Sequence, residues 1–170
     1  MGKASAIISA VVIGIVATVV MGSCNSSGCT DNQSSLPLAG FYSSTTNEPV
    51  LLPYIEIYGV GAPNDSILYQ SGQGHSIVYL PFRNSSNQVS YVFHYTQQGI
   101  DSDEFNDTLT FTYSSEPYFA SEQCGAMYCY DISKLDYTCH LIDSVVITDS
   151  LVTNTDIERI KIYFRTSSAN

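Results

Sequence analysis

The sequence predicts an all-β protein: an antiparallel β-sandwich of the immunoglobulin-like or Greek-key type, with about eight or nine strands behind an N-terminal signal peptide. From Val50 onward, Tyr, Val, Ile, Thr and Phe alternate with polar residues at a period of two, as in half-buried strands. Clusters of Gly, Pro, Asn and Asp interrupt these runs about every eight to twelve residues. After the signal peptide, no window of helical length shows a 3.6-residue period.

The individual strands follow from this alternation in chain order. The ranges expected are 51–60, 66–70, 75–82, 89–95, 107–113, 118–122, 126–131, 144–148 and 158–165. The glycine-rich residues 71–74 are expected to close a hairpin between the second and third of these strands.

Two strands are regular enough to assign their faces. The side chains expected to point into the core are Leu109, Phe111, Tyr113, Ile160, Ile162 and Phe164. On the last strand, Arg159, Lys161 and Tyr163 alternate with the apolar residues and are expected to face water.

The amino terminus predicts a lipoprotein signal peptide. Lys3 precedes an apolar run over residues 6–21, and the run leads into Met21-Gly22-Ser23-Cys24, which resembles a lipobox. Lipidation, with acyl chains such as palmitate, is therefore expected on Cys24. The alternative is an uncleaved anchor, because about 18 apolar residues can span a bilayer. The expected organisation is a signal peptide over 1–23, a polar tether over 24–36 and a single β-sandwich domain over 37–170.

Cleavage before Cys24 would leave a strongly acidic chain. Without Lys3, five Lys and Arg residues stand against sixteen Asp and Glu, which gives a net charge of −11. Such a surface repels phosphate backbones, so no nucleic-acid partner is expected. It also repels anionic lipid, so the membrane contact expected is the lipid on Cys24 alone.

The four cysteines other than Cys24 predict two disulfides, because an even set outside the cytoplasm tends to oxidise. These cysteines are Cys29, Cys124, Cys129 and Cys139. The alternative is a metal site that combines the four thiols with His140. Its spacing matches no familiar zinc motif, so no metal site is expected.

A hairpin geometry selects one pairing. If residues 126–131 and 137–148 are the two arms of a hairpin, Cys129 lies opposite Cys139 within cross-strand bridging distance. The two other cysteines then pair with each other by elimination, and that bridge closes a loop of nearly a hundred residues.

No residue pattern predicts catalysis, so neither an enzyme nor a cofactor is expected. His75 and Ser76 lie in the expected hairpin, and the chain contains no Gly-x-Ser-x-Gly motif. His75, His94 and His140 share no metal-ligand spacing. An enzyme assembled from dispersed residues is the alternative class.

The acidic stretch 101–107 begins like a calcium-binding loop and then departs from one. Phe105 stands where a ligand is needed, Asn106 where a glycine is needed, and Thr112 where a bidentate glutamate is needed. A solvated turn is therefore expected, with calcium or carbohydrate binding by this loop as an alternative function.

A three-residue pattern of Asp, then Ser or Thr, then an aliphatic residue recurs four times. It resembles the acceptor sequon of the general O-glycosylation system of Bacteroidetes. The alternative is that Asp and Ser end turns while the aliphatic residue opens the next strand. The candidate acceptors are Ser66, Thr108, Ser144 and Ser150.

Several short motifs together resemble a family of small uncharacterised lipoproteins of Bacteroidetes, a domain of unknown function. They are the lipobox cysteine with a second cysteine after it, and "PLAGFY", "DSILY", "IVYLPF", "DTLTFTYSS", "SEQCGAMY" and "IKIYF". The resemblance implies a pair between Cys29 and Cys124. It also implies an outer-membrane β-barrel protein as partner, because family members are often encoded beside one. Residues 25–28 lack the acidic export run of surface-exposed lipoproteins, which favours the periplasmic face.

These observations lead us to expect a lipoprotein anchored to the outer membrane in the cell envelope. Its β-sandwich is expected to be a non-catalytic binding or structural module. The lipid would concentrate the module near a membrane partner, which raises the effective concentration for a modest interaction.

Overall fold

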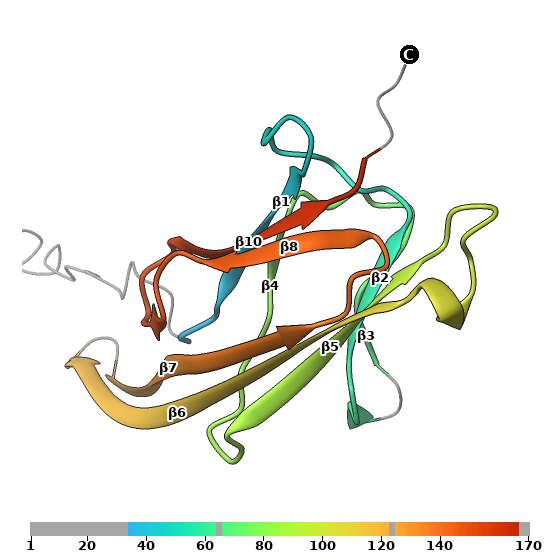
Figure 1. Cartoon of the computed structure of the whole chain (residues 1–170). Coiled ribbons are helices and arrows are strands. Elements are labelled where there is room, and N and C mark those ends of the chain that lie inside the picture. The colour runs from blue at the N-terminus through green and yellow to red at the C-terminus, as the bar shows by residue number, and fades with distance from the viewer. Residues whose placement is uncertain (1–33, 64–65, 123–124, 167–170) are drawn as a thin grey trace, which may run out of the picture. The chain divides into compact units, whose positions relative to one another are not determined.

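Ten strands form two sheets in the computed structural model, which describes residues 34–63, 66–122 and 125–166 (Figure 1). In chain order they are β1 (Leu38–Ser43), β2 (Ile55–Gly59), β3 (Ile67–Tyr69), β4 (Ile77–Tyr79), β5 (Gln88–Tyr95), β6 (Asp107–Ser121), β7 (Gly125–Tyr137), β8 (Ile142–Ile147), β9 (Leu151–Val152) and β10 (Glu158–Phe164). One short 3-10 turn, η3 (Asp103–Phe105), precedes β6. The all-β sandwich predicted from the sequence is confirmed.

The two sheets contain four and six strands. Their orders are β4-β1-β10-β8 and β3-β2-β5-β6-β7-β9. Neighbouring strands are antiparallel except for β1 and β10, which run parallel and place the first and last strands side by side (Figure 1). The sequence analysis did not predict this parallel pair.

The core lies between the sheets and follows the predicted alternation. Each of Leu109, Phe111, Tyr113, Ile160, Ile162 and Phe164 is at most 3% exposed, as predicted. Aromatic rings join the layers: Phe41 of the four-stranded sheet lies edge-on to Phe93 of the six-stranded sheet, with ring centroids 6.3 Å apart. Phe41 also packs against Phe164 on the neighbouring strand β10, with ring centroids 5.2 Å apart.

The predicted hairpin around residues 71–74 is wrong. β3 pairs with β2 in the six-stranded sheet, whereas β4 pairs with β1 in the four-stranded sheet. Gly72 and Gly74 have positive φ angles of 90° and 71°, which side chains other than glycine rarely adopt. The glycine turn therefore carries the chain from one sheet to the other.

The predicted hairpin between residues 126–131 and 137–148 is also wrong. β7 continues unbroken through this region and pairs with β6 along its whole length, from Leu109 with Tyr137 to Ser121 with Gly125. The separate strands predicted at 107–113 and 118–122 are parts of this one long β6. β5 pairs with β6 only as far as Thr112, and β9 pairs with β7 only at Tyr130 and Asp131. Residues 116–121 of β6 and 125–129 of β7 therefore form a two-stranded arm (Figure 1).

This continuity removes the predicted bridge between Cys129 and Cys139, both of which are free thiols. Cys129 lies opposite Glu116 on β6, and Cys139 follows the end of β7. A strand rises about 3.3 Å per residue, so Cys129 is already about 26 Å from Tyr137. A disulfide requires Cα atoms within about 7 Å. Cys24, Cys29 and Cys124 lie outside the described residues.

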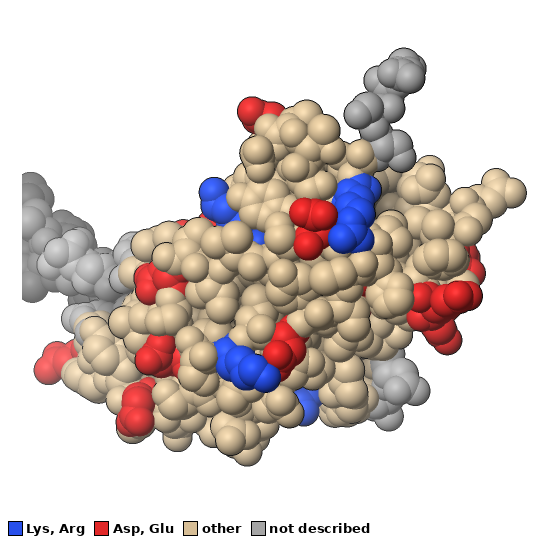
Figure 2. All heavy atoms as spheres, in the orientation of Figure 1, with Lys and Arg blue, Asp and Glu red and all other residues tan. Residues whose placement is uncertain are grey.

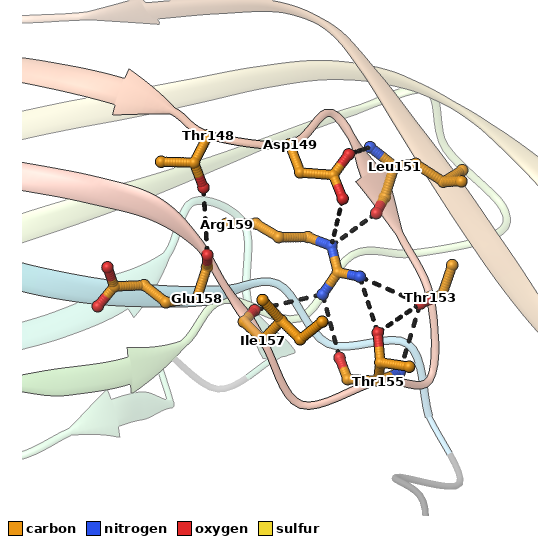
Figure 3. A network of polar contacts seen from close by, with 8 residues as sticks. All are labelled: Thr148, Asp149, Leu151, Thr153, Thr155, Ile157, Glu158 and Arg159. Carbon is orange, nitrogen blue, oxygen red and sulfur yellow. Dashed lines mark hydrogen bonds and ion pairs between the residues drawn. The ribbon is translucent and has the colours of Figure 1, made fainter.

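Arg159 is buried, contrary to the prediction that it faces water. Its side chain is 3% exposed because the connection from β8 through β9 to β10 folds over it (Figure 3). The guanidinium donates to the carbonyl oxygens of Leu151, Thr155 and Ile157 and to the hydroxyls of Thr153 and Thr155, at 2.6 to 3.2 Å. Asp149 adds an ion pair at 3.6 Å. The arginine thus fixes a connection that has little regular structure of its own.

Over residues 34–63, 66–122 and 125–166, no helix is long and apolar enough to cross a membrane. The predicted signal peptide, 1–23, lies outside these ranges. Ser35, near the end of the predicted tether, is buried at 5% exposure. The chain therefore packs against the sandwich before β1 begins.

Candidate functional site

A hollow of about 580 Å³ lies at one end of the sandwich, and we call it the end pocket. Four segments converge on it: the approach to β2, the β5–β6 connection, the β7–β8 connection and the end of β10. Its apolar walls include Leu52, Ile55, Ile100, Phe105, Leu141 and Phe164. Both sheets therefore contribute to the pocket, and sites of this size and lining commonly hold small molecules.

Asp107 forms hydrogen bonds with residues that line the end pocket. Its carboxylate has no exposed surface, although it opens β6 in a chain whose surface is acidic. One oxygen, Oδ1, accepts from the Thr138 hydroxyl at 2.9 Å and from the His140 amide at 2.7 Å. The other oxygen, Oδ2, accepts from the amides of Leu141 and Ile142, both at 2.8 Å.

Tyr95 supplies the fifth donor to this carboxylate. Its hydroxyl donates to Oδ2 of Asp107 at 2.8 Å, and its ring lines the end pocket. Burial raises the pKa of Tyr95 well above its usual range, and the neighbouring Asp107 charge raises it further. The phenol therefore stays protonated and keeps donating. Five donors from three elements hold the β7–β8 connection against the start of β6, so the pocket has a rigid base.

The rim of the end pocket carries a fixed cation. Arg165 donates through Nη1 to the carbonyl oxygens of Cys139 at 2.7 Å and His140 at 2.8 Å. Its Nε lies 3.3 Å from Oδ1 of Asp143. Among the described residues, Nη2 of Arg165 and the imidazole of His140 have no hydrogen-bond partner. Two sets of donors on lining residues of the end pocket are therefore not used by any residue that the structure describes.

The lining carries no carboxylate in the part of the chain that the structure describes. Elsewhere the described surface is rich in acidic groups, and in the view of Figure 2 they are scattered, with some basic side chains beside them. Ion pairs such as Lys134 with Asp136, at 2.6 Å, account for part of this arrangement. The end pocket is therefore an acid-free region of a strongly acidic molecule.

The acidic stretch 101–107 does not converge on a common point. Asp101 contacts Nε2 of His94 at 3.3 Å, and Asp103 accepts from the Asn106 side chain at 3.1 Å. Asp107 turns inward, where its oxygens are occupied by hydrogen-bond donors. No group of three His, Cys, Asp or Glu residues within the described ranges could hold a metal ion. The loop instead contributes Ile100 and Phe105 to the end pocket.

The three histidines share no contact partner. His75 contacts the carbonyl of Gln70 through Nε2 at 3.1 Å, and His94 contacts Asn106 through Nδ1 at 2.8 Å. His140 lies on the rim of the end pocket. None of them is hydrogen-bonded to a hydroxyl or thiol of a described residue. Within the described ranges, these histidines therefore form no hydrogen-bonded pair with a nucleophile of the kind used in covalent catalysis.

The candidate O-glycosylation acceptors differ in exposure. Ser66 and Ser150 are exposed, whereas Thr108 and Ser144 are half-buried within β6 and β8. The aspartate that precedes Thr108 is the buried Asp107, so this copy of the pattern has a structural use. Modification at the four positions stays a prediction.

Sequence reasoning missed the residues that build the end pocket. Arg165 stands at the end of a strand, where an exposed polar tip is expected. Tyr95 continues the apolar alternation of residues 89–95, which indicates burial but no partner for its hydroxyl, and no motif surrounds either residue. Asp107 carried one signal, because it opens a regular strand in alternation with Leu109 and Phe111 and so falls on the apolar face. That signal does not reveal its five donors, four of which lie more than thirty residues away, while the fifth, Tyr95, lies on another strand.

The fold and the site define a small two-sheet β-protein with a pocket between the ends of its sheets. A family model places it more closely: the chain belongs to the family of unknown function DUF6452, whose model matches residues 54–164, more than half of its length. This match runs from the approach to β2 to the end of β10 and leaves out β1. Comparison with curated proteins and with solved structures gave no significant match.

Proposed function

We propose that this chain is a lipid-anchored protein of the cell envelope whose β-sandwich is a non-catalytic binding module acting through the end pocket. The pocket carries the proposal. It has the size and apolar lining of a binding site, and the Asp107 network holds its base in place. Asp107 and Tyr95 are fully engaged with each other and with backbone amides, which suits binding rather than proton transfer.

Anchoring is proposed from the lipobox. Lipid on Cys24 would hold the mature chain on the outer membrane at its periplasmic face, as the resemblance to lipoproteins of Bacteroidetes implies. The eleven residues from Cys24 to Ser34 would span at most about 35 Å if fully extended. A partner in the same membrane, such as an outer-membrane β-barrel protein, would then meet the module at a raised effective concentration.

The place where the chain joins the sandwich supports a displayed pocket. Residues 34–36 share a small hollow with Met127 and Tyr130, near the start of β7. The end pocket lies beyond the other end of β7. Tyr130 and Tyr137 alone are about 23 Å apart along this strand. The pocket would therefore lie at the opposite end of β7 from residues 34–36, where a partner can reach it.

The anchoring part is tested by the intact mass of the protein purified from its own membranes without reduction. A diacylated or triacylated chain that begins at Cys24 is expected. The Cys24→Ser variant is expected in the soluble fraction. A chain that keeps residues 1–23, or a variant that still sediments with membranes, would contradict the lipid anchor.

The binding part is tested by photo-crosslinking in cells. A photoreactive amino acid replaces Gln97, which is exposed and lines the end pocket, or Gln88, which is exposed and lies away from it. A crosslinked species is expected at position 97, absent at position 88 and reduced by Cys24→Ser. Equal crosslinking at both positions, or none at 97, would contradict binding through this pocket.

A further inference from the structure

We infer that the ligand of the end pocket is an amphiphilic monoanion, a carboxylate joined to an aliphatic body. The inference rests on the proposed binding role of the pocket and adds the chemistry of what it binds. Three independent features of the described residues point to this class: the apolar walls, the held guanidinium on the rim and the lack of acidic lining.

The walls fit an aliphatic body. Leu52, Ile100, Phe105 and Leu141 pack against the core but are only half-buried, so each keeps apolar surface toward the pocket. Covering this surface removes it from water, which is the main driving force for binding of apolar groups. A volume of about 580 Å³ lies within the range of small-molecule pockets.

The rim fits a carboxylate. Nη1 and Nε of Arg165 are engaged by Cys139, His140 and Asp143, which hold the guanidinium plane in one orientation. The two N–H groups of Nη2 are left for a ligand. A guanidinium that is already oriented loses little conformational freedom when an anion binds, and charge-assisted hydrogen bonds are stronger than neutral ones. The unengaged imidazole of His140 supplies a second donor on the same rim.

Electrostatics disfavour the opposite class of ligand. The chain has sixteen acidic residues, yet none of those described lines the end pocket. A cationic ligand would meet Arg165 without a carboxylate to pair with. Among the described residues, Asp143 is the acidic group that pairs with this cation, on the Nε side, where it competes with an incoming anion for the same charge. This competition gives a variant that should improve binding.

The test uses calorimetric titration of the full mature chain carrying Cys24→Ser, which needs no detergent. Octanoate is the probe, and octanamide is its neutral match. Octanoate is expected to bind at least tenfold more tightly than octanamide. Arg165→Gln is expected to weaken octanoate at least tenfold and to leave octanamide unchanged. Lys134→Gln, which removes the same charge from an exposed site on β7, is expected to change neither.

Asp143→Asn is the second variant, and it keeps the contacts of Arg165 with the two carbonyl oxygens. It is expected to tighten octanoate severalfold without affecting octanamide, a result that a structural role of Arg165 would not produce. Equal binding of the two probes, or unchanged octanoate binding in Arg165→Gln, would overturn the anion class while leaving an apolar binding pocket. Absence of octanoate binding would overturn the inference, and crosslinking at Gln97 would still decide the proposed function separately.

Discussion

Replacing Asp107 by asparagine tests whether one buried carboxylate joins the β7–β8 connection to the start of β6. The side chain keeps its shape but loses its charge and one of its two acceptor oxygens. If the amide oxygen takes the place of Oδ2, the new NH₂ group faces the Thr138 hydroxyl and the His140 amide. The hydroxyl can rotate to accept a hydrogen bond, whereas the backbone N–H cannot.

The expected cost follows from these contacts. One backbone donor left without a partner costs about 1–3 kcal/mol, and the other hydrogen bonds weaken when the acceptor is neutral. Relief from burying a charge offsets part of this loss. We expect the free energy of unfolding to fall by about 3 kcal/mol. This is a large share of the total stability of a typical domain, which is about 5–15 kcal/mol. Asp107→Ala leaves all five hydrogen-bond donors without their acceptor and is expected to prevent folding.

Urea unfolding followed by far-ultraviolet circular dichroism measures this loss. Asp136→Asn is the matched control, because Asp136 is exposed on β7 and pairs only with Lys134. We expect it to change stability by less than about 0.5 kcal/mol. Hydrogen exchange gives a local readout: the amides of residues 140–142 should exchange faster in Asp107→Asn. Unfolding within about 0.5 kcal/mol of the wild type, with unchanged exchange at these amides, would refute the reasoning.

Three further perturbations test other parts of the molecule. Burial raises the pKa of Tyr91 and Tyr95, so above pH 10 the folded state keeps protons that the unfolded chain releases, and these two residues together should lower stability by about 2.7 kcal/mol per pH unit. Tyr95→Phe should make the slope measured in urea titrations shallower by about 1.4 kcal/mol per pH unit, and an unchanged slope would contradict this. Arg159→Met should lower the free energy of unfolding by about 3 kcal/mol, because it leaves buried carbonyl oxygens without a hydrogen-bond donor. Arg83→Met, at an exposed position, should change it little, and equal unfolding midpoints of the two variants would count against the Arg159 network. Cys29→Ser should leave the thiol of Cys124 free for titration and lower the free energy of unfolding by about 4 kcal/mol, because the predicted Cys29–Cys124 disulfide closes a long loop. An unchanged melting curve would argue against this disulfide.

The sequence alone determined which side chains are buried in most strands. Leu109, Phe111 and Tyr113 face the core because a strand turns alternate side chains to opposite faces, and this depends only on local geometry. The same rule placed Ile160 and Ile162 correctly. Fold class followed as well, since a chain of short alternating strands has few ways to bury its apolar faces other than two packed sheets.

Strand pairing was decided only by the tertiary structure. Any strand edge offers the same backbone donors and acceptors, so alternation does not say which neighbour it takes. β3 therefore belongs to the six-stranded sheet and β4 to the four-stranded sheet, although a glycine turn joins the two strands. β7 extended through the expected turn and separated Cys129 from Cys139.

The end pocket likewise could not be predicted from the sequence. The alternation indicates that Tyr95 is buried and leaves Asp107 and Arg165 as polar residues at strand ends, but the roles of all three depend on partners from distant segments. A carboxylate can be buried only where enough donors converge on it, and that convergence exists only after the sheets have packed. The alternation in the sequence thus determined what the protein buries, and the long-range pairing determined where its charged groups meet.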